Sequence, residues 1–578
     1  MILLKNRKWF LFVDTVLRFN IKQIFALIRD RLNKKLWYTF KRLEYNKLTE
    51  NEKAKFIIFK ASCQGSFFQN KLNTEYMVYY HFYHKKLLDT NLENTDYSQL
   101  WLKSNNFELD NNYQRFHLFN IMFLNNQNDQ KQIIKLIVSW IKNHEEIKGS
   151  PWNGFNCSMR IVNWVKLLSL LRIDFDISNK TWVLIENSIC QQAQHINNNI
   201  EHHIPGNHVI LQYFSLLLVF ENFPKWNFSV KNNKNIRQKF FAEIENEYLN
   251  NGLHFEQSYH YHLQITIMCL IWMDMEVKSK RRVSEKIIDI ITKAVSVVEK
   301  FRFSNDYLPM IGDNCFNFFN PTLHDDFEHI LTFKKSLGLL SPREQEKLTL
   351  ENQYQIVKIK KEELIFDIGN IGLKYNPGHG HSDLSNFIYI SHGTTLFVDP
   401  GTRQYSNTEE DLQLKKSKSH NTISINSEDQ AKLWGFFRWA YLPKNISNTY
   451  NQSEDEIKLS NEYLGFINIG GYKHYREISL KDGRLNIIDK VFGNSNCDIS
   501  ISFILNHDIK IERENNIIKL KKYNHIWIVS SAQTDIIKVG KQYVYPNYDV
   551  PYMSKRIEFK FNSVNLPFEN NLSVEYKR

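Results

Sequence analysis

The sequence predicts a multidomain α+β protein with a helical first part and an antiparallel β-sandwich as its last part. Three observations predict this fold class. The chain has 578 residues, too many for one ordinary hydrophobic core, so two or more domains are expected. From about residue 70 to residue 345, apolar residues recur at the period of a helix. Beyond residue 345, short runs of alternating or apolar residues are separated by turn residues, as in antiparallel strands.

Residues 1–60 are predicted to form a basic, helical extension. An apolar run from Trp9 to Val13 is interrupted by Asp14, and no A-x-A-like cleavage site follows it. Residues 1–50, including the segment 19–29, have the pattern of a basic amphipathic helix, which binds either another part of the protein or a membrane surface. We expect it to pack on the helical domain of the same chain, and peripheral membrane contact stays open. No apolar segment reaches the roughly 18–20 residues that span a bilayer.

Residues 61–350 are predicted to form one helical domain. In the segment 161–168 apolar side chains follow the i, i+3, i+4, i+7 spacing of one buried helix face, and the segment 133–140 behaves similarly. The segment 209–220 is almost wholly apolar, as expected for an inner helix that is covered on several sides. Helices that follow one another without a strand between them predict an α/α toroid or an irregular bundle.

Residues 351–578 are predicted to form a sandwich of antiparallel sheets. The candidate strands are 364–369, 386–391, 422–426, 485–489, 499–503 and 527–529. So many strands need several sheets, and stacked sheets bury a shared core. We expect the ligand site in a cleft between the two domains, because domain interfaces commonly form such sites.

Composition and charge exclude several classes of protein. Hydrophobic residues make up 42% and charged residues 24% of the chain, which is typical of a globular protein. The net charge of +12 suits a polyanion, whether an acidic glycan, nucleic acid or an anionic membrane. No zinc-finger spacing, RNP-like motif or Walker loop supports nucleic acid, so no nucleic-acid partner is expected. The six cysteines have no C-x-x-C spacing and predict no disulfide framework.

The densest group of reactive side chains lies in Asn376-Pro-Gly-His-Gly-His-Ser-Asp383. His379 and His381 flank one glycine, in a loop with few other side chains. Asp399 follows an apolar strand, and His420 begins another. Two histidines and an aspartate on neighbouring strands are a suitable ligand set for zinc. We therefore expect one zinc ion on His381, Asp399 and His420.

The helical part has its own polar groups. Asn207 and His208 immediately precede an apolar helix, so Asn207 is either an N-cap or, with His208, part of the cleft. Glu256, Tyr261 and His262 lie in a second polar segment, Asn251-Gly-Leu-His-Phe-Glu-Gln-Ser-Tyr-His-Tyr-His262. Packing of aromatic side chains in a helix would explain the tyrosines of this segment, but it does not explain why so many His and Glu residues lie at the start of a helix.

These motifs resemble the heparinase II/III-like polysaccharide lyases. GHGHSD, LFVDPGT and SHNTISINSEDQ are similar to the central block of that family, and the resemblance extends from about Trp152 to Val491. It implies an incomplete (α/α) toroid followed by a β-sandwich. It also implies an acidic polysaccharide as the substrate. The compartment is open: the family suggests the periplasm or cell envelope, and the absence of a clear signal peptide keeps the cytoplasm open.

The resemblance implies roles for individual residues. Asn207 and His208 would bind the carboxylate of a uronate, and His379 and Tyr261 would transfer protons at C5 and O4. Tyr259 lies two positions from Tyr261, about 200° round a helix axis, so only one of them can face the cleft. Tyr261 keeps the family spacing. The zinc would hold the loop that carries His379 rather than react itself.

Six further residues match family positions around the substrate: Arg160, Glu256, His262, Arg438, His474 and Tyr475. Arg160 could instead make a structural ion pair. The family often has His-Arg-Arg where this chain has Lys473-His-Tyr-Arg476, so the roles of His474 and Tyr475 stay open. The function expected is β-elimination of a uronate-containing polysaccharide. The alternatives are a uronyl C5-epimerase and a non-catalytic protein that binds glycans or assembles envelope polysaccharide.

Overall fold

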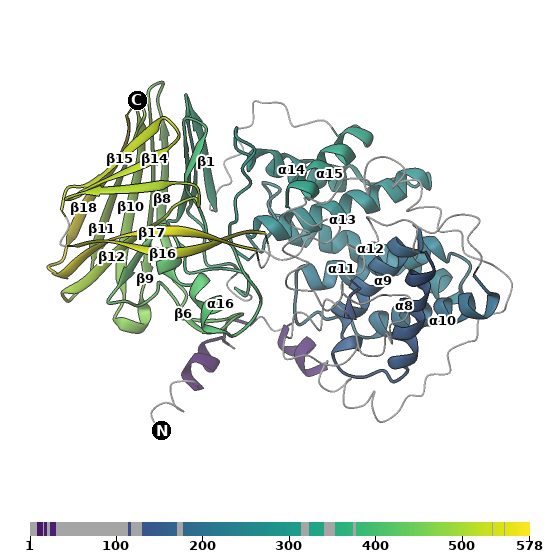
Figure 1. Cartoon of the computed structure of the whole chain (residues 1–578). Coiled ribbons are helices and arrows are strands. Elements are labelled where there is room, and N and C mark those ends of the chain that lie inside the picture. Colours follow the sequence, from purple (N-terminus) through teal and green to yellow (C-terminus); the bar gives the residue numbers. More distant parts are fainter. Residues whose placement is uncertain are drawn as a thin grey trace.

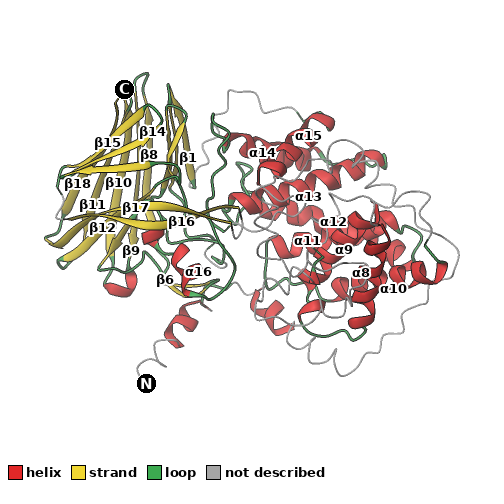
Figure 2. Ribbon diagram, viewed as in Figure 1, coloured by secondary structure: helices red, strands yellow, loops and turns green. Residues whose placement is uncertain are grey.

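The protein has a helical half and a β half, which lie side by side (Figure 1). The structure is a computed structural model, and it describes residues 9–15, 17–19, 23–29, 114–116, 130–169, 177–313, 323–339, 353–373, 377–533, 536–547 and 550–577. Helices fill one half and strands fill the other (Figure 2), as the two hydrophobic periods predict.

An incomplete (α/α) toroid forms the helical half. Its described helices are α8 (Gln130–Asn143), α9 (Gly154–Ser169), α10 (Asn179–Asn198), α11 (Asn207–Asn222), α12 (Asn227–Glu247), α13 (Tyr259–Lys278), α14 (Glu285–Lys300) and α15 (Leu323–Ser336). Helix α11 packs against α9, α10, α12 and α13, and every side chain from 209 to 220 is buried. This enclosure explains why its sequence is apolar all round. None of the described helices is long and apolar enough to cross a membrane.

Antiparallel sheets form the β half. One sheet has the order β1-β2-β3-β4, another β13-β14-β15-β18-β11-β10-β9-β8, a third β16-β17-β12-β5, and β6 and β7 form a two-stranded hairpin. The bounds are β1 (Tyr354–Ile359), β2 (Glu362–Asp367), β3 (Phe387–Ser391), β4 (Thr394–Phe397), β5 (Ile423–Ile425), β6 (Lys432–Gly435), β7 (Arg438–Ala440), β8 (Lys444–Gln452), β9 (Glu456–Gly465), β10 (Tyr472–Lys481), β11 (Arg484–Phe492), β12 (Cys497–Ile504), β13 (Lys510–Glu514), β14 (Ile517–Lys522), β15 (His525–Ser531), β16 (Ile536–Asn547), β17 (Val550–Val564) and β18 (Phe568–Lys577). Short helix α16 (Glu409–Leu414) lies among the loops between β4 and β5.

The β1–β4 sheet is shared by both hydrophobic cores. Leu364 and Phe366 of β2 belong to the core of the sandwich, whereas Ile365 between them belongs to the core of the toroid. Strands β2 and β3 are therefore buried on both faces, which explains their continuous apolar runs. A shared apolar core holds the two halves in one arrangement and so fixes the loops at their boundary.

The change from helix to strand falls near the predicted position. The last helix that the structure describes before the sheets ends at Ser336, and β1 begins at Tyr354. Within the described part of the helical half, Tyr248 and His254 form an isolated β-bridge that belongs to no strand. The domain limits at 60 and at 350 stay predictions, because both fall outside the described residues.

The N-terminal extension agrees only in part with the expectation that it packs on the helical domain. Residues 9–15 are helical and dock on the β half, not on the toroid. Thr15 Oγ1 donates a hydrogen bond to the Trp439 carbonyl at 3.0 Å, and the Tyr441 amide donates to Asp14 at 3.1 Å. The segment 23–29 lies near the toroid instead, where burial and then the charge of Arg29 lower the pKa of His202 to about 4. The described parts of the extension thus bond to the β half and lie near the toroid.

Candidate active site

The loop with the two central histidines meets the toroid at the start of α13. The amide of Asp313 donates to the His379 carbonyl at 3.2 Å, and Ser258 Oγ donates to the Asp313 carbonyl at 2.7 Å. A Cβ on Gly380 would lie 2.8 Å from the amide nitrogen of Gly372, so only glycine permits this close approach. The backbone contacts therefore place His379 directly beside helix α13.

Tyr261 and His379 face each other across the boundary between the halves. Their ring centroids lie 4.2 Å apart, and the Tyr261 hydroxyl lies 2.9 Å from the hydroxyl of Tyr405. Tyr259, in contrast, stacks on Phe301 in the core of the toroid. Of the two tyrosines, Tyr261 is thus the one beside His379, on the side that its spacing predicts.

A buried ion pair that the sequence did not reveal holds both histidines. Asp313 accepts hydrogen bonds from His379 Nδ1 at 3.0 Å and from His381 Nε2 at 2.9 Å. Lys415 Nζ contacts both Asp313 carboxylate oxygens, at 2.9 and 3.0 Å. Burial alone would raise the pKa of Asp313, but Lys415 and the two imidazoles hold it well below its usual range. Asp313 is therefore a carboxylate that fixes both rings.

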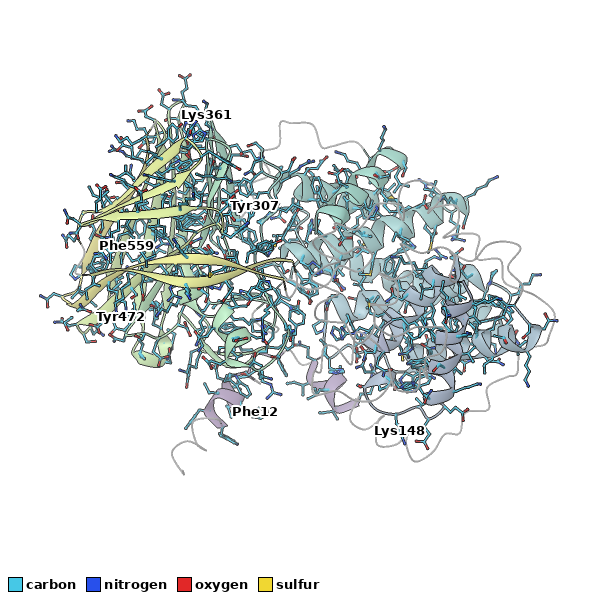
Figure 3. All side chains as sticks on the ribbon, in the orientation of Figure 1. Phe12, Lys148, Tyr307, Lys361, Tyr472 and Phe559 are labelled. Carbon is cyan, nitrogen blue, oxygen red and sulfur yellow. The ribbon has the colours of Figure 1, made fainter. Side chains whose placement is uncertain are left out.

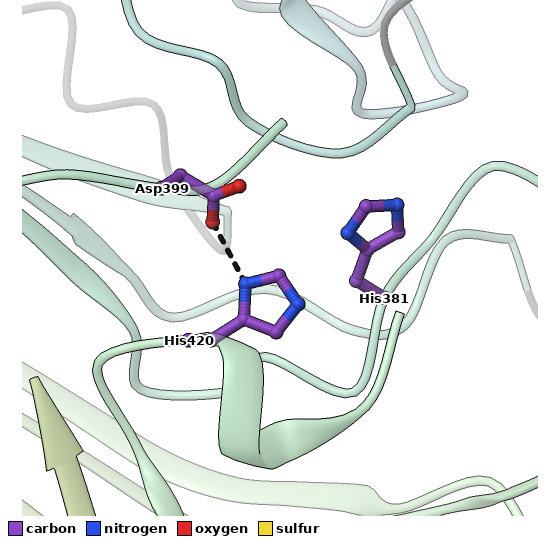
Figure 4. A group of neighbouring side chains, drawn as sticks. All are labelled: His381, Asp399 and His420. Atoms are coloured by element: carbon purple, nitrogen blue, oxygen red, sulfur yellow. Dashed lines mark hydrogen bonds and ion pairs between the residues drawn. The ribbon is translucent and has the colours of Figure 1, made fainter. Parts of the chain in front are cut away.

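Three predicted metal ligands come together next to this pair (Figure 4). The candidate ligand atoms of His381, Asp399 and His420 all lie within 4.8 Å of one another, and all three side chains are buried. His420 Nδ1 donates to Asp399 Oδ2 at 2.9 Å. His381 Nδ1 and His420 Nε2 are buried without a hydrogen-bond partner among the described residues. Buried polar atoms are rarely left unsatisfied, so these two nitrogens suit a bound metal ion.

Asn207 and His208 begin helix α11 on the toroid side. The N-cap of α11 is Gly206, and no side chain caps this end, so the alternative that Asn207 is an N-cap is wrong. Among the described residues, no hydrogen bond involves its side-chain amide, although it is buried. His208 Nδ1 donates to Glu201 Oε2 at 3.0 Å, and the His208 side chain is 26% exposed. The Asn207 amide and His208 Nε2 are thus available to a ligand.

Glu256 lies between the two groups of residues. Its Oε1 accepts a hydrogen bond from the backbone N–H of Asn207 at 3.3 Å, and its Oε2 is buried without a partner among the described residues. Burial raises the pKa of Glu256, while the charge of His379, the Asn207 hydrogen bond and the charge of His208 act in the opposite direction. These effects indicate that Asn207, His208, Glu256 and His379 form one electrostatic cluster.

Arg160 does not reach this cluster, which corrects its expected contact with substrate. The side chain is fully buried and stacks 3.7 Å from the Trp140 ring centroid. Its Nε donates to Gln192 at 2.9 Å, and its Nη1 donates to the carbonyls of Gln114 and Pro151 at 2.9 Å. Its partners are neutral, so it also forms no ion pair in the described structure. Arg160 therefore links several segments of the toroid to one another through hydrogen bonds.

His262 and His474 are likewise corrected from substrate contacts to structural residues. His262 accepts the His254 amide at Nδ1 and donates from Nε2 to the Ala294 carbonyl at 2.9 Å. His474 contacts Asp489 through Nε2 at 2.7 Å and the Tyr463 hydroxyl through Nδ1. Both rings are fully buried and use both nitrogens within the protein, so neither is free to bind a substrate.

Tyr475 and Arg438 are the two remaining residues for which the sequence predicts substrate contact. Tyr475 points to the opposite face of β10 from His474, and its hydroxyl donates to Glu477 at 2.8 Å. Its contact with substrate stays a prediction. Arg438 is exposed and lies 5.0 Å over the Trp434 ring. The adjacent Phe437 contacts the His379 ring at 5.7 Å. Substrate binding by Arg438 stays a prediction.

A second buried ion pair supports the loops of the metal ligands from the β half. Arg476 donates to Asp489 from Nε at 2.7 Å and from Nη2 at 2.9 Å. Its Nη1 donates to the carbonyls of Ser385 and Asn421, which neighbour the ligand loops. Arg476, two residues after His474 in the sequence, therefore stabilises these loops and is not exposed to solvent.

We expect Asp489→Asn to destabilise the protein strongly. The change leaves Arg476 charged and poorly paired in the core, which typically costs about 3–5 kcal/mol of unfolding free energy. Denaturant unfolding of the full chain measures this loss. Glu575→Gln is the matched control, because it removes the partner of Arg484, 50% exposed on the adjacent strand, and should change stability little. A similar small loss in both variants would contradict the structural role of Asp489.

Comparison with known proteins identifies the two halves separately. The family model described as heparinase II/III N-terminus matches residues 78–324, and the model described as heparinase II/III-like, C-terminal, matches residues 342–573. A heparin-sulfate lyase of Bacteroides thetaiotaomicron is 22% identical over 427 residues. That match covers 65% of this chain and 58% of the relative, so the chain spans less than two thirds of its length.

Solved structures show the same fold. A crystal structure of heparinase III matches with a TM-score of 0.67 and 17% identity, over 94% of this chain and 88% of that chain. The heparan sulfate lyase HepC from Pedobacter heparinus matches with a TM-score of 0.54 and 14% identity, over 96% of this chain and 88% of that chain. Both similarities extend over the toroid and the sandwich together.

Proposed function

The chain belongs to the heparinase II/III-like family, and from this premise we propose that it cleaves a uronate-containing acidic polysaccharide by β-elimination. The observation that carries the proposal is the contact of His379 with Tyr261 across the two halves. Asn207, with His208 next to it, is joined through its backbone amide to Glu256, which lies in the segment that leads into helix α13 and Tyr261. Asn207 and His208 are donors for a carboxylate, and His379 and Tyr261 are two groups for proton transfer, drawn from both halves of the protein. The lyase names of two relatives agree with this chemistry.

The first requirement of the reaction is stabilisation of negative charge. The C5 proton of a uronate is poorly acidic while its carboxylate is ionised, because its removal creates a second negative charge. Donors that are already in position stabilise that charge without reorganising. The Asn207 side-chain amide supplies such a donor, and His208 supplies a second from Nε2 when its ring is protonated, with Glu201 accepting from Nδ1 and fixing the ring. The start of α11 adds the positive end of a helix dipole.

The second requirement is transfer of two protons. His379 donates its Nδ1 hydrogen to Asp313, so Nε2 carries the lone pair that takes the C5 proton. As the C5–H electrons form the C4–C5 double bond, the C4–O4 bond breaks. The Tyr261 hydroxyl gives its proton to O4, and the new chain end is an unsaturated uronate. Tyr405, 2.9 Å from Tyr261, is placed to return a proton to the phenolate.

Ultraviolet absorbance of the unsaturated product tests the proposal. The full chain is incubated with a panel of uronate polymers, from heparin-like to alginate-like, and absorbance should rise with at least one of them. His379→Ala is the inactive control. A C5-epimerase on this scaffold would instead exchange the C5 proton for solvent deuterium without any rise in absorbance. Binding without exchange or cleavage on every polymer would indicate the non-catalytic alternative.

Asn207→Ala should lower turnover by about 10²–10³, the usual cost of losing one donor from a preorganised anion site. Its melting temperature should hardly change, because Asn207 caps no helix in this structure. Rate and thermal melting are measured on the same variant. Gln194→Ala, on the toroid helix α10 and outside the cluster, is the control for small changes in packing. A large drop in melting temperature with normal turnover would contradict the role of Asn207.

We also propose that His381, Asp399 and His420 bind one zinc ion. Two buried nitrogens without partners and one carboxylate form a three-residue set that zinc accepts, at bond lengths of about 2.0–2.2 Å. A bound zinc ion would supply a fixed positive charge in the β half. The chain's own contribution is the link from His381 Nε2 to Asp313, which aligns the His379 loop with the ligand set.

Elemental analysis should find one zinc ion in each purified chain. His420→Ala should lose it, and chelator treatment should lower the melting temperature of the wild type only. His507→Ala is the matched control, since this histidine is exposed on the β half and should keep the metal. An unchanged zinc content in His420→Ala, or no stoichiometric metal in the wild type, would refute this assignment independently of any activity.

A further inference from the structure

The β6–β7 hairpin ends in two aromatic residues beside the candidate active site. Gly435 pairs with Arg438, so Phe436 and Phe437 form the two-residue turn between the strands. Turns of this length are usually built from Gly, Asn, Asp or Ser. Phe436 is buried, but Phe437 is 46% exposed. The geometry of the turn therefore does not explain why a half-exposed phenylalanine lies at this place.

Phe437 lies against the residues proposed for proton transfer. Its ring centroid is 5.7 Å from that of His379 and 5.5 Å from that of Tyr405, with the rings nearly perpendicular in both pairs. Tyr405 in turn is hydrogen-bonded to Tyr261. A single exposed aromatic side chain elsewhere on a protein surface needs no explanation. Phe437 is instead one ring away from the groups that act on the substrate, so a sugar held at His379 is within reach of it.

Contacts with neighbouring loops hold the turn in one position. The Phe436 backbone amide donates a hydrogen bond to Asn407 Oδ1 at 2.9 Å. The Lys415 ammonium lies 4.3 Å from the centroid of the Phe436 ring, a distance at which a cation is attracted to an aromatic face. Phe436 thus ties the turn to the buried ion pair that orients His379, and Phe437 is presented from a fixed place next to it.

The helical segment 9–15 supports the strands of the same hairpin. Trp434 Nε1 of β6 donates to Thr15 Oγ1 at 3.3 Å, and Thr15 Oγ1 donates to the Trp439 carbonyl of β7 at 3.0 Å. In the shared view of Figures 1 and 3, this segment, which carries the labelled Phe12, lies next to β6. Both family matches begin later in the chain, the first of them at residue 78. The chain thus stabilises the hairpin with a segment that precedes the matched region.

We propose that Phe437 is a platform on which a sugar ring of the substrate stacks, and so a specificity-determining residue. One face of a pyranose ring presents mainly C–H groups, whose hydrogens are attracted to the negative face of an aromatic ring. The stacked ring belongs to one of the two sugars joined by the bond that breaks, because these are the sugars at His379. The inference rests on the proposed function for the place of the substrate. It adds an apolar contact to the charged contacts that hold an acidic polysaccharide.

Binding of the uronate polymers of the panel, heparin and alginate among them, tests the platform by calorimetry. The full chain with Tyr261→Phe is the parent, since it keeps its rings but should not consume the polymer. Adding Phe437→Ala should weaken binding roughly tenfold to a hundredfold, the effect of losing one buried aromatic side chain. Phe437→Tyr keeps the aromatic face and should bind nearly as the parent does, whereas Phe437→Leu should bind several-fold more weakly. The loss in Phe437→Ala should be the same at low and high salt, because salt screens charges and not stacking.

Tyr523→Ala is the matched control for an exposed aromatic residue in a tight turn. Tyr523 lies in the two-residue turn of the β14–β15 hairpin and is 91% exposed. Its loss should leave polymer binding unchanged. Equal binding by Phe437→Ala and its parent would overturn the inference even where cleavage is observed, and so would a failure of every polymer to bind. Binding that depends on Phe437 without any cleavage would support the platform and contradict the lyase reaction instead.

Discussion

Tyr261→Phe should lower turnover by about 10²–10⁴, the range typical of a lost acid–base group, while the protein stays folded. The substitution keeps the ring and its 4.2 Å contact with His379. It removes the hydroxyl that lies 2.9 Å from Tyr405 and that would protonate the leaving O4 oxygen. A steady-state rate on the substrate found in the polymer panel, together with a thermal melt, measures both effects.

Tyr259→Phe is the matched control, two residues away on the same helix. Its hydroxyl donates to the Val298 carbonyl at 3.3 Å inside the toroid, so its loss should cost about 1 kcal/mol of stability and leave turnover intact. The two variants should therefore show opposite patterns. If Tyr259→Phe were the inactive one, the correspondence with the family would be displaced by two residues. If both stayed active, another group would have to protonate O4.

The division into a helical part and a β part was predictable from local periodicity, whereas the choice of a toroid over an irregular bundle came from the family resemblance. The uninterrupted apolar stretch in α11 predicted an inner helix, and the runs in β2 and β3 predicted strands. Sequence alone did not show that β1–β4 joins two cores, since a strand buried on both faces has the same pattern in any sheet. Nor did it show where residues 9–15 dock, because an amphipathic pattern does not name its partner.

The candidate site was predictable where the residues are close in sequence. His379, His381 and the Tyr261 segment lie in dense motifs with unusual composition. Asp313 and Lys415 were missed because each is a single charged residue far along the chain from its partner. Asp313 lies 66 residues from His379, and Lys415 lies 102 residues from Asp313. No local pattern reports such a contact, and only the fold brings the partners together.

Some residues were given the wrong role for a related reason. Arg160, His262 and His474 have the residue types of a substrate site, but all three side chains are fully buried. Residue type shows which hydrogen bonds a side chain can make, and not whether its partner is a substrate or the protein. One signal would have helped for His474. It lies on a strand whose side chains alternate between buried and partly exposed, so His474 and Arg476, two residues later, both point into the core.

Asp313→Asn should lower turnover by about 10²–10⁴, because an amide no longer fixes the proton of His379 on Nδ1. The same carboxylate neutralises Lys415, so the single variant also leaves a buried ammonium without its counter-charge. The double variant Asp313→Asn, Lys415→Met removes both charges and keeps the test informative if the single variant does not fold. Thr402→Val is the control, since its hydroxyl makes only a 3.3 Å contact with Asp313.

A double-mutant cycle with His379 separates positioning from general stability. If Asp313 acts through His379, adding Asp313→Asn to His379→Ala should cause little further loss of turnover, because effects of residues that act as a unit are not additive. The pH profile of the single variant should also change, since the hydrogen bond that sets the His379 tautomer is altered. Equal and independent losses in both backgrounds would show that Asp313 only supports the fold. The buried carboxylate that links His379, His381 and Lys415 would then connect the two halves without serving the proton transfer.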